Sequence, residues 1–263
     1  MSLGVALLSV EGLTKSYGGI HAVRGVSFML QAGEILALIG PNGAGKSTCF
    51  DMLNGQNIPD SGLISVMGEN TTGRKPREVW RLGVGRTFQI TSTYPTMTVR
   101  ENIQVALVSY YRRLFDVWSP MASIERGEAD RLLDLVGMAG YAERPCGELA
   151  YGDLKRLELA IALANHPKLL LMDEPTAGMA PRERVELMRL TAKIAREQSI
   201  GVLFTEHDMD VVFEHADRIL VLNRGTLIAQ GSPAEVRGNR EVQAIYLGEG
   251  LLYDSRHREG ASA

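Results

Sequence analysis

The sequence lacks the features that mark several classes of protein. Only two cysteines, Cys49 and Cys146, occur among 263 residues, too few for a disulfide framework and typical of a reducing compartment. No apolar run approaches the roughly 18 residues of a membrane span. The N-terminal run VALLSV (5–10) has no basic flank and is too short for a signal peptide, so we expect it to form the first strand.

An excess of charge of one sign is also missing. The 28 basic residues nearly balance the 31 acidic ones, and the net charge of −3 gives no electrostatic reason to expect a nucleic-acid partner. A hydrophobic content of 45% and a charged content of 22% are ordinary for a soluble globular protein. The length of 263 residues allows one large domain with a subdomain.

What the sequence does contain is a glycine-rich loop, GPNGAGKST, which matches the pattern G-x-x-x-x-G-K-[ST] in full. The apolar run 34–39 before it favours a buried strand, and residues 48–54 after it can start a helix. We predict a nucleoside-triphosphate site in which Lys46 reaches the β- and γ-phosphates and Ser47 holds Mg²⁺. The binding residues expected from this loop are Gly40, Pro41, Asn42, Gly43, Ala44, Gly45, Lys46, Ser47 and Thr48.

A second block, KLLLMDEP (168–175), ends four apolar residues with two carboxylates. A buried strand would deliver these acids to the edge of an α/β sheet where ligands bind. Alone, the block could be an ordinary strand that ends in a charged turn. Beside a phosphate loop, we interpret Asp173 as part of the Mg²⁺ shell and Glu174 as the base that polarises the attacking water.

A third block, LAYGDLKRLELAIALA (149–164), places a small-aromatic-glycine turn at the head of a predicted helix. Apolar residues at 154, 157, 161 and 164 predict one buried face, and His166-Pro167 ends the helix. Here the sequence resembles the ATP-binding-cassette (ABC) family, whose signature is LSGGQ or a variant such as LAYGQ. The resemblance extends over nearly the whole chain.

Several further residues match that family in order and spacing, and their roles are what the resemblance implies. Tyr17, in SYGGIHAV, matches the aromatic that stacks on adenine. Gln89, in RTFQ, matches the Q-loop glutamine, with a catalytic and a metal role. His207, in FTEHD, matches the switch histidine, a catalytic residue. The nucleotide-binding signature residues are Leu149, Ala150, Tyr151, Gly152 and Asp153.

The resemblance implies an α/β fold, a P-loop NTPase (RecA-like) core with an antiparallel β-subdomain and a helical signature subdomain. We expect a single ABC ATPase domain over 1–263. Its core and β-subdomain take 1–88 and 166–250, the helical subdomain 89–165, and a tail 251–263.

Local patterns predict strands and helices along the chain. We expect strands at 61–67, 201–205, 218–222 and 226–230, and helices at 99–114, 124–137, 152–165, 182–197 and 233–247, with Pro181 in the first turn of the fourth helix.

In this family one cassette holds only part of a site, and the signature turn of a second ABC ATPase, in a homo- or heterodimer, caps the γ-phosphate. Because this chain has no predicted span, the membrane permease subunits are expected to be separate polypeptides. The segment TSTYPTMTVRENI (91–103) is where we expect them to bind. The expected location is cytoplasmic, peripheral on the inner face of the cell membrane, with ATP and Mg²⁺ as cofactors.

Within the family the sequence is most similar to ATPase subunits of branched-chain amino-acid importers, through LAYG, KRLELA (155–160) and YLGEG (246–250). Such systems add a periplasmic or extracellular substrate-binding protein. Three alternatives stay open: a urea or short-amide importer, an exporter, and a soluble ABC ATPase that acts on nucleic acid or ribosomes.

The chain departs from the family pattern at three positions. Ala150 stands where many members have serine, Asp153 where glutamine is usual, and Ala180 where the family commonly has Asp or Asn. In a heterodimer this predicts a weaker site wherever the partner borrows this signature. The alternative is that alanine is an accepted variant and that Asp153 points to solvent.

Overall fold

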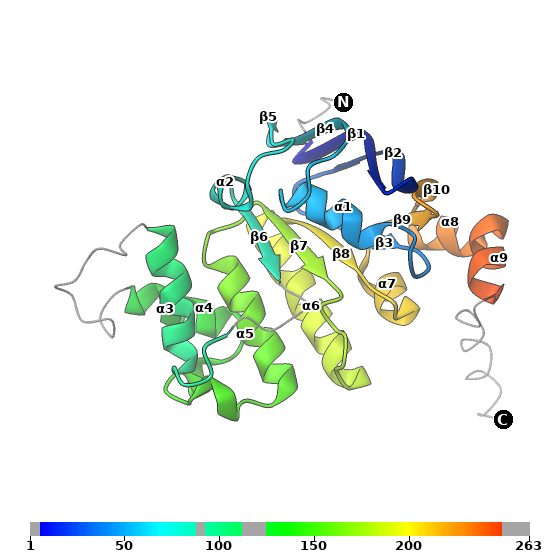
Figure 1. The fold of residues 1–263 in the computed structure, drawn as a ribbon. Helices are drawn as coiled ribbons and strands as arrows, with labels where there is room; N and C mark the ends of the chain where they lie inside the picture. Colours follow the sequence, from blue (N-terminus) through cyan, green and yellow to red (C-terminus); the bar gives the residue numbers. More distant parts are fainter. Residues whose placement is uncertain (1–5, 88–92, 112–124, 249–263) are drawn as a thin grey trace, which may run out of the picture.

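The structure is a computed structural model that describes residues 6–87, 93–111 and 125–248 (Figure 1). Gln89 and the predicted tail 251–263 lie outside the described residues. The elements, in chain order, are β1 Leu8–Tyr17, β2 Ile20–Leu30, β3 Ile35–Ile39, α1 Lys46–Leu53, β4 Ser61–Val66, β5 Glu69–Asn70, α2 Pro76–Arg81, β6 Val84–Thr87, α3 Val99–Tyr110, α4 Arg126–Leu135, η2 Ala139–Tyr141, η3 Cys146–Glu148, α5 Tyr151–Leu163, β7 Leu169–Asp173, α6 Pro181–Gln198, β8 Gly201–Thr205, α7 Met209–His215, β9 Arg218–Asn223, β10 Thr226–Gly231, α8 Pro233–Gly238 and α9 Arg240–Gly248.

The described strands form two sheets. A six-stranded sheet has the order β10-β9-β3-β8-β7-β6, in which β9 to β6 run parallel and β10 pairs antiparallel with β9. A four-stranded antiparallel sheet has the order β2-β1-β4-β5. In Figure 1 this second sheet lies over α1, and α3 to α6 lie on the opposite side of the large sheet. The predicted α/β P-loop NTPase fold is confirmed.

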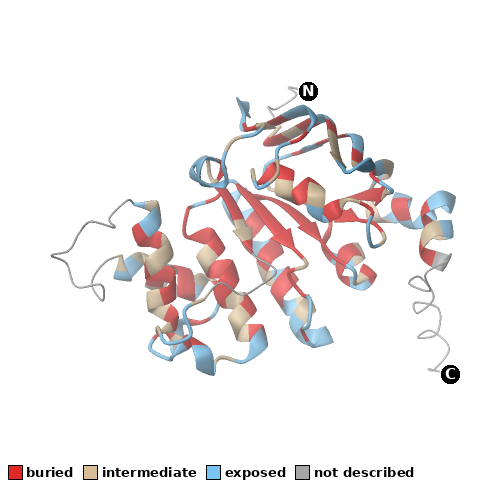
Figure 2. Cartoon of the chain, viewed as in Figure 1, coloured by how far each residue is buried: buried red, intermediate tan, exposed pale blue. Residues whose placement is uncertain are grey.

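The central strand β3 separates two hydrophobic clusters. Its side chains alternate, so Ile35 and Ile39 pack in the cluster that contains α3 to α7, whereas Leu36 and Leu38 pack in the cluster of β1, β2, β4 and α1. Every residue of β3, β7 and β8 is buried (Figure 2). A parallel strand covered on both faces reads as a continuous apolar run, which is why these strands were visible in the sequence.

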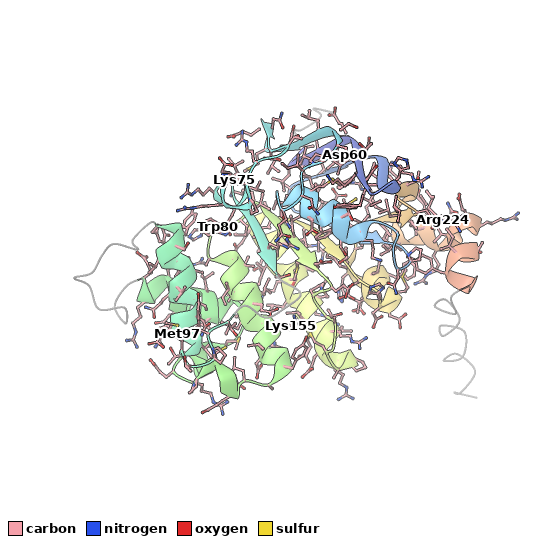
Figure 3. The ribbon with its side chains drawn as sticks, viewed as in Figure 1. Asp60, Lys75, Trp80, Met97, Lys155 and Arg224 are labelled. Atoms are coloured by element: carbon pink, nitrogen blue, oxygen red, sulfur yellow. The ribbon has the colours of Figure 1, made fainter. Side chains whose placement is uncertain are left out.

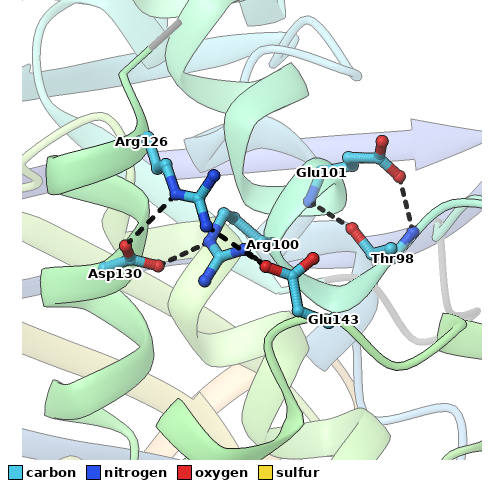
Figure 4. A network of polar contacts seen from close by, with 6 residues as sticks. All are labelled: Thr98, Arg100, Glu101, Arg126, Asp130 and Glu143. Atoms are coloured by element: carbon cyan, nitrogen blue, oxygen red, sulfur yellow. Dashed lines mark hydrogen bonds and ion pairs between the residues drawn. The ribbon is translucent and has the colours of Figure 1, made fainter. Parts of the chain in front are cut away.

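The helices α3 and α4 are joined by a charged network (Figure 4). The Arg100 side chain, only 12% exposed, donates from Nε to Asp130 Oδ1 at 2.6 Å and from Nη1 to Glu143. Arg126 contacts the same two carboxylates. Thr98 caps α3 by accepting a bond from the Glu101 amide at 3.2 Å. The network fixes the start of α3 against α4 and the chain near Glu143.

The helix α5 is buried beyond its predicted face. The predicted apolar face is found, because Leu157 and Ala164 are buried and Leu154 and Ile161 pack against the same core. Burial also extends beyond that face to Lys155 and Glu158. Lys155, labelled in Figure 3, donates to Glu158 Oε2 at 2.9 Å. This ion pair, with both side chains at least 90% buried, lets α5 pack against neighbours on several sides.

The segment 233–247 is helical as predicted, but it is divided into α8 and α9 at Asn239. Asn239 has an extended ψ of 121° and ends α8, and its Oδ1 accepts bonds from the amides of Glu241 and Val242 at the start of α9. An asparagine that caps the next helix favours a break over continuation.

Most of the other predicted elements are found within a residue or two where the structure describes them, but the first strand is Leu8–Tyr17 and extends well beyond the predicted 5–10. Pro181 is the first residue of α6, as expected. The predicted helix 99–114 starts at Val99 as expected but ends earlier, at Tyr110, with Tyr111 as its C-cap. Residue 124, the predicted start of the next helix, lies outside the described residues. Among the helices that the structure describes, none is long and apolar enough to cross a membrane.

Candidate functional site

The phosphate loop runs between β3 and α1, and two glycines set its path. At Gly45, where φ is 105°, an added Cβ would lie 2.3 Å from the carbonyl oxygen of Ala22. At Gly40 an added Cβ would lie 2.1 Å from the carbonyl oxygen of Leu222. Both contacts are with backbone atoms, so no larger residue fits at either position. The loop is therefore pressed against β2 and β9.

The same loop holds its lysine inward and leaves its outer side open. Lys46 is 7% exposed, and its Nζ donates to the carbonyl oxygens of Gly40 at 2.6 Å and Pro41 at 3.1 Å. Ser47 is exposed in the first turn of α1, and a Cβ at Gly43 would meet nothing within 4 Å. A phosphate on this side would meet backbone amides, the start of α1 and the ammonium group of Lys46.

The two predicted acids lie where β7 ends, beside the end of β8. Asp173 is 8% exposed, and its Oδ1 accepts a bond from Thr205 Oγ1 at 2.7 Å. The Glu174 amide donates to Thr205 Oγ1 at 3.0 Å and to the Thr205 carbonyl at 3.2 Å. Thr205 pairs with Asp173 across the two parallel strands. One threonine thus fixes both acidic residues.

Glu174 and His207 are brought together, as the site prediction requires. The imidazole Nε2 of His207 and the carboxylate Oε1 of Glu174 are 2.9 Å apart. Glu174 has a left-handed φ of 49°, which costs a residue with a Cβ roughly 1–2 kcal/mol. The two side chains are 23% and 45% exposed, so a water molecule has access to both.

Tyr17 lies at the end of β1, beside the phosphate loop. It pairs with Ile20 at the tip of the β1–β2 hairpin, and β2 contains Ala22, which touches Gly45. The Tyr17 side chain is 45% exposed, and Lys15 Nζ lies 5.5 Å from the centre of its ring. An exposed ring at this place offers a flat apolar face to a base whose phosphates lie in the loop.

The signature turn Leu149–Asp153 lies at the start of α5, at the end that is far from α1 in Figure 1. Tyr151, 46% exposed, donates from its hydroxyl to the carbonyl of Ala177 at 3.0 Å. A Cβ at Gly152 would lie 3.0 Å from the Glu183 carboxylate. Asp153 is the third residue of α5, where an acidic side chain suits the helix dipole.

The start of α6 explains how the chain accommodates Ala180. Ala180 precedes the helix and has no side-chain oxygen to cap it. The Glu183 carboxylate instead accepts a bond from the Ala180 amide at 3.2 Å. Pro181, the first residue of α6, has no amide hydrogen to satisfy. The helix therefore starts without the Asp or Asn that the family commonly has here.

Sequence reasoning missed residues that support these groups. Thr205 and Glu206 lie immediately before His207, and Glu206 is 5% exposed. Burial raises the pKa of Asp51, which lies on α1. Arg86 opposes this shift, and the nearby carboxylate of Asp173 adds to it. The acidic residue directly before the predicted switch histidine was the signal available.

The two cysteines have no part in this site. Cys49 and Cys146 are buried, and burial raises the pKa of the Cys49 thiol to about 12. The Cys49 thiol therefore stays protonated at neutral pH and serves as packing.

The residues present fit Mg²⁺. Among the described residues, no cluster of three His, Cys, Asp or Glu side chains could hold a metal ion alone. Mg²⁺ in nucleotide sites needs only one or two protein oxygens, because phosphates and water complete its octahedron. Ser47 and Asp173 supply oxygens of this kind, from α1 and from the end of β7.

The fold and this loop define a nucleotide-binding P-loop ATPase, and the comparisons narrow the class. The family model described as ABC transporter matches residues 23–177. A second model, branched-chain amino acid ATP-binding cassette transporter, matches residues 226–251. The chain belongs to the ABC transporter ATP-binding family.

Curated relatives match along almost their whole length. The chain is 40% identical over 250 residues to the high-affinity branched-chain amino acid transport ATP-binding protein LivG of Salmonella typhimurium, covering 92% of this chain and 98% of that relative. It is 38% identical over 254 residues to the corresponding protein BraF of Pseudomonas aeruginosa, with the same coverage.

Solved structures agree. The ADP conformation of MJ1267, an ATP-binding cassette of an ABC transporter, matches with a TM-score of 0.83 and 29% identity over 93% of this chain and 99% of that one. CbiO1 of Clostridium perfringens, part of an ABC transporter complex, matches with a TM-score of 0.79 and 30% identity, covering 94% of this chain and 98% of that one. A dimeric cassette, MJ0796 bound to ADP and phosphate, matches with a TM-score of 0.72 and 25% identity, covering 86% of this chain and 98% of that one.

Proposed function

We propose that this chain is the ATP-hydrolysing subunit of a membrane transporter that imports branched-chain or other hydrophobic amino acids. The observation that carries the ATPase part is the Glu174–His207 pair, 2.9 Å apart at the ends of adjacent strands. The relatives named for branched-chain amino acid transport support the cargo class.

The site residues take complementary roles in this proposal. Lys46 and the loop amides hold the phosphates of ATP. Glu174 accepts a proton from the attacking water, and His207 donates a hydrogen bond to the γ-phosphate. Ser47 and Asp173 would hold Mg²⁺, which supplies charge neutralisation at the phosphates when it is bound. Gln89 takes the family role of contacting water and metal.

The site is completed by a second ABC ATPase, whose signature turn places amides and the dipole of its α5 against the γ-phosphate. ATP joins the two subunits, and hydrolysis releases them. In this proposal the opening and closing drives separate permease subunits that hold this chain at the inner face of the cell membrane. A periplasmic or extracellular binding protein delivers the cargo.

Uptake of labelled leucine tests the proposal as a whole. A deletion strain complemented with the wild-type gene should regain uptake, and hydrophobic membrane subunits should co-purify with the protein. Lys46→Ala should not restore uptake and should lose tight ATP binding, because the charge that serves the phosphates is gone. Lys193→Ala, at a 69% exposed position on α6, is the matched control. Restored leucine uptake with Lys46→Ala, or co-purification with ribosomes alone, would contradict the proposal.

A further inference from the structure

The buried carboxylate of Glu206 has no part in the roles assigned above. It lies between β8 and α7 and accepts three hydrogen bonds. Its Oε1 accepts from the Thr176 amide at 2.9 Å and from the Thr176 hydroxyl at 2.6 Å. Its Oε2 accepts from the His207 amide at 3.1 Å. Glu206 and Thr176 are 5% and 1% exposed. The carboxylate therefore joins the turn after β7 to the turn after β8.

A second contact joins the same two turns further along the chain. Arg184, in the first part of α6, donates from Nε to the Met179 carbonyl at 2.7 Å. Its Nη1 donates to Asp208 Oδ2 at 2.7 Å. The segment that leaves Glu174 and the segment that contains His207 are thus fixed at two places, and Glu206 bonds directly to the His207 backbone amide.

The contacts of Glu206 and Thr205 hold Glu174 in its strained, left-handed conformation. A left-handed residue with a Cβ persists only where the surrounding structure holds it. Thr205 fixes the amide of Glu174 itself. Glu206 fixes the amide of Thr176, two residues further on, and so anchors the other side of the turn. Loss of that anchor would let Glu174 relax and would also free the backbone of His207.

We propose that Glu206 is a positioning residue for ATP hydrolysis: it holds Glu174 and His207 in their 2.9 Å contact through Thr176 and through its own bond to the His207 amide. The inference rests on the proposed ATPase function. Glu206 acts through the two side chains and does not touch the nucleotide. Its loss should therefore lower kcat and leave the KM for ATP nearly unchanged.

Glu206→Gln is the first variant, because it keeps the shape and removes the charge. The amide NH₂ must face either the Thr176 amide or the His207 amide, and in both cases a donor meets a donor. We expect kcat to fall on the order of 10-fold to 100-fold, the scale of a small misplacement of reacting groups. ATP binding, measured by titration of the full-length chain, should stay within about 2-fold of wild type.

A pair of substitutions at Thr176 separates positioning from packing. Thr176→Val keeps the volume and loses the hydroxyl bond, so kcat should fall roughly 5-fold to 10-fold. Thr176→Ser keeps the hydroxyl and loses a methyl group, so thermal stability should fall while kcat stays within about 2-fold. A packing role predicts the reverse order. Thr191→Val is the matched control, since the Thr191 hydroxyl is also buried and donates to the Leu187 carbonyl at 2.9 Å.

Hydrogen exchange on the nucleotide-free chain gives a readout that does not depend on turnover. The amides of 174–180 and 205–208 should exchange faster in Glu206→Gln and Thr176→Val than in wild type or Thr191→Val. Faster exchange with unchanged kcat would reduce Glu206 to a structural role and overturn the inference. Wild-type exchange in both variants would overturn it as well. A wild-type assembled transporter without ATP turnover would contradict the proposed function itself, whereas an active wild type with equally active variants contradicts only this inference.

Discussion

The strand-end site at β7 and β8 and the signature turn of α5 are built in opposite ways. At the strand ends, Asp173, Thr205 and Glu206 are each at most 8% exposed. Hydrogen bonds of 2.6–3.0 Å join the end of β7 and the segment that follows it to the segment at the end of β8. At the signature turn, Ala150 provides no side-chain cap and Tyr151 is 46% exposed. The strand-end part is fixed before any ligand arrives, whereas the signature turn has no side-chain cap and carries an exposed aromatic ring.

This difference matches what each part has to do in the proposed cycle. The groups that act on water must be held in place, because preorganised groups need no rearrangement at the moment of reaction. A turn that has to receive a phosphate from another subunit must leave its amides exposed. We therefore expect substitutions at the strand ends to lower the chemical rate strongly, and substitutions at the signature turn to have smaller effects that depend on the partner.

The largest effect is expected for Glu174→Gln. The amide cannot accept a proton from water, so ATP turnover should fall roughly 10²–10⁴-fold, the usual contribution of a positioned base. ATP affinity should stay near that of wild type, because Glu174 is not among the phosphate-binding groups. Steady-state turnover and nucleotide titration measure the two quantities. If turnover matches that of the control Glu197→Gln on the exposed face of α6, the base must be sought elsewhere.

The second effect concerns the adenine end of the same site. Tyr17→Ala should weaken ATP binding by about 1–3 kcal/mol, or about 5-fold to 150-fold in Kd, if the exposed ring stacks on the base. Tyr17→Phe keeps the ring and should be nearly silent. Titration with ATP compares the two variants. Equal losses for the two variants would instead assign the effect to a hydrogen bond of the tyrosine hydroxyl.

The strand-end site could be predicted from the sequence because its signals are local. The apolar runs before Lys46 and Asp173 indicated buried strands, and parallel strands bring their carboxyl ends to one edge of a sheet. His207 followed a run of the same kind. Glu174 and His207 were each expected to be catalytic, and the structure places the two residues together.

The supporting contacts could not be predicted, because they depend on which side chains meet across the sheet. Nothing in the sequence pairs Thr176 with Glu206 or Arg184 with Asp208. The burial of Lys155 and Glu158 escaped prediction for the same reason, since two charges at helical spacing normally indicate a solvated face. The break at Asn239 was missed because the helical pattern is equally good on both sides of it.

The third prediction concerns the signature turn. Ala150→Ser adds a hydroxyl at the N-cap of α5 and should stabilise the helix by about 0.5–2 kcal/mol. The same hydroxyl can donate to a γ-phosphate, and Asp153→Gln removes a carboxylate from that vicinity. In the assembled transporter, the double variant should raise turnover by roughly 2-fold to 10-fold at the site that borrows this turn.

The gain in turnover of the double variant should depend on the partner ATPase. The gain should vanish when the catalytic glutamate of the partner ATPase is replaced by glutamine, because that residue serves the improved site. A gain that survives this replacement would place the effect in this chain's own site. Unchanged turnover, with both sites equally active from the start, would remove the asymmetry and leave the alanine as an accepted variant.

The smallest expected effect is a pH dependence of the folding stability that arises at His215, on the helix next to the strand-end site. His215 ends α7, the helix that follows His207, and is 6% exposed. Burial lowers the pKa of His215 below its ordinary 6.5; Arg189 and Arg196 add to this shift, and Glu214 opposes it. The folded chain therefore binds the proton less readily than the unfolded chain. Stability should be constant above about pH 7.5 and should fall as the pH drops through 6.5 toward the folded pKa.

Denaturant unfolding between pH 8 and pH 5.5 tests this sign. His215→Gln should lose part of the decline, because the titrating group is gone, whereas His21→Gln, at an exposed position, should keep it. Hydrogen exchange should show the loosening at low pH first in α7 and the neighbouring residues 205–208, and later, if at all, in α5. A decline of equal size in wild type and His215→Gln would move the titrating group elsewhere. Loosening that begins in α5 would contradict the role of His215, because acid would then act first on the signature helix and not on the strand-end site.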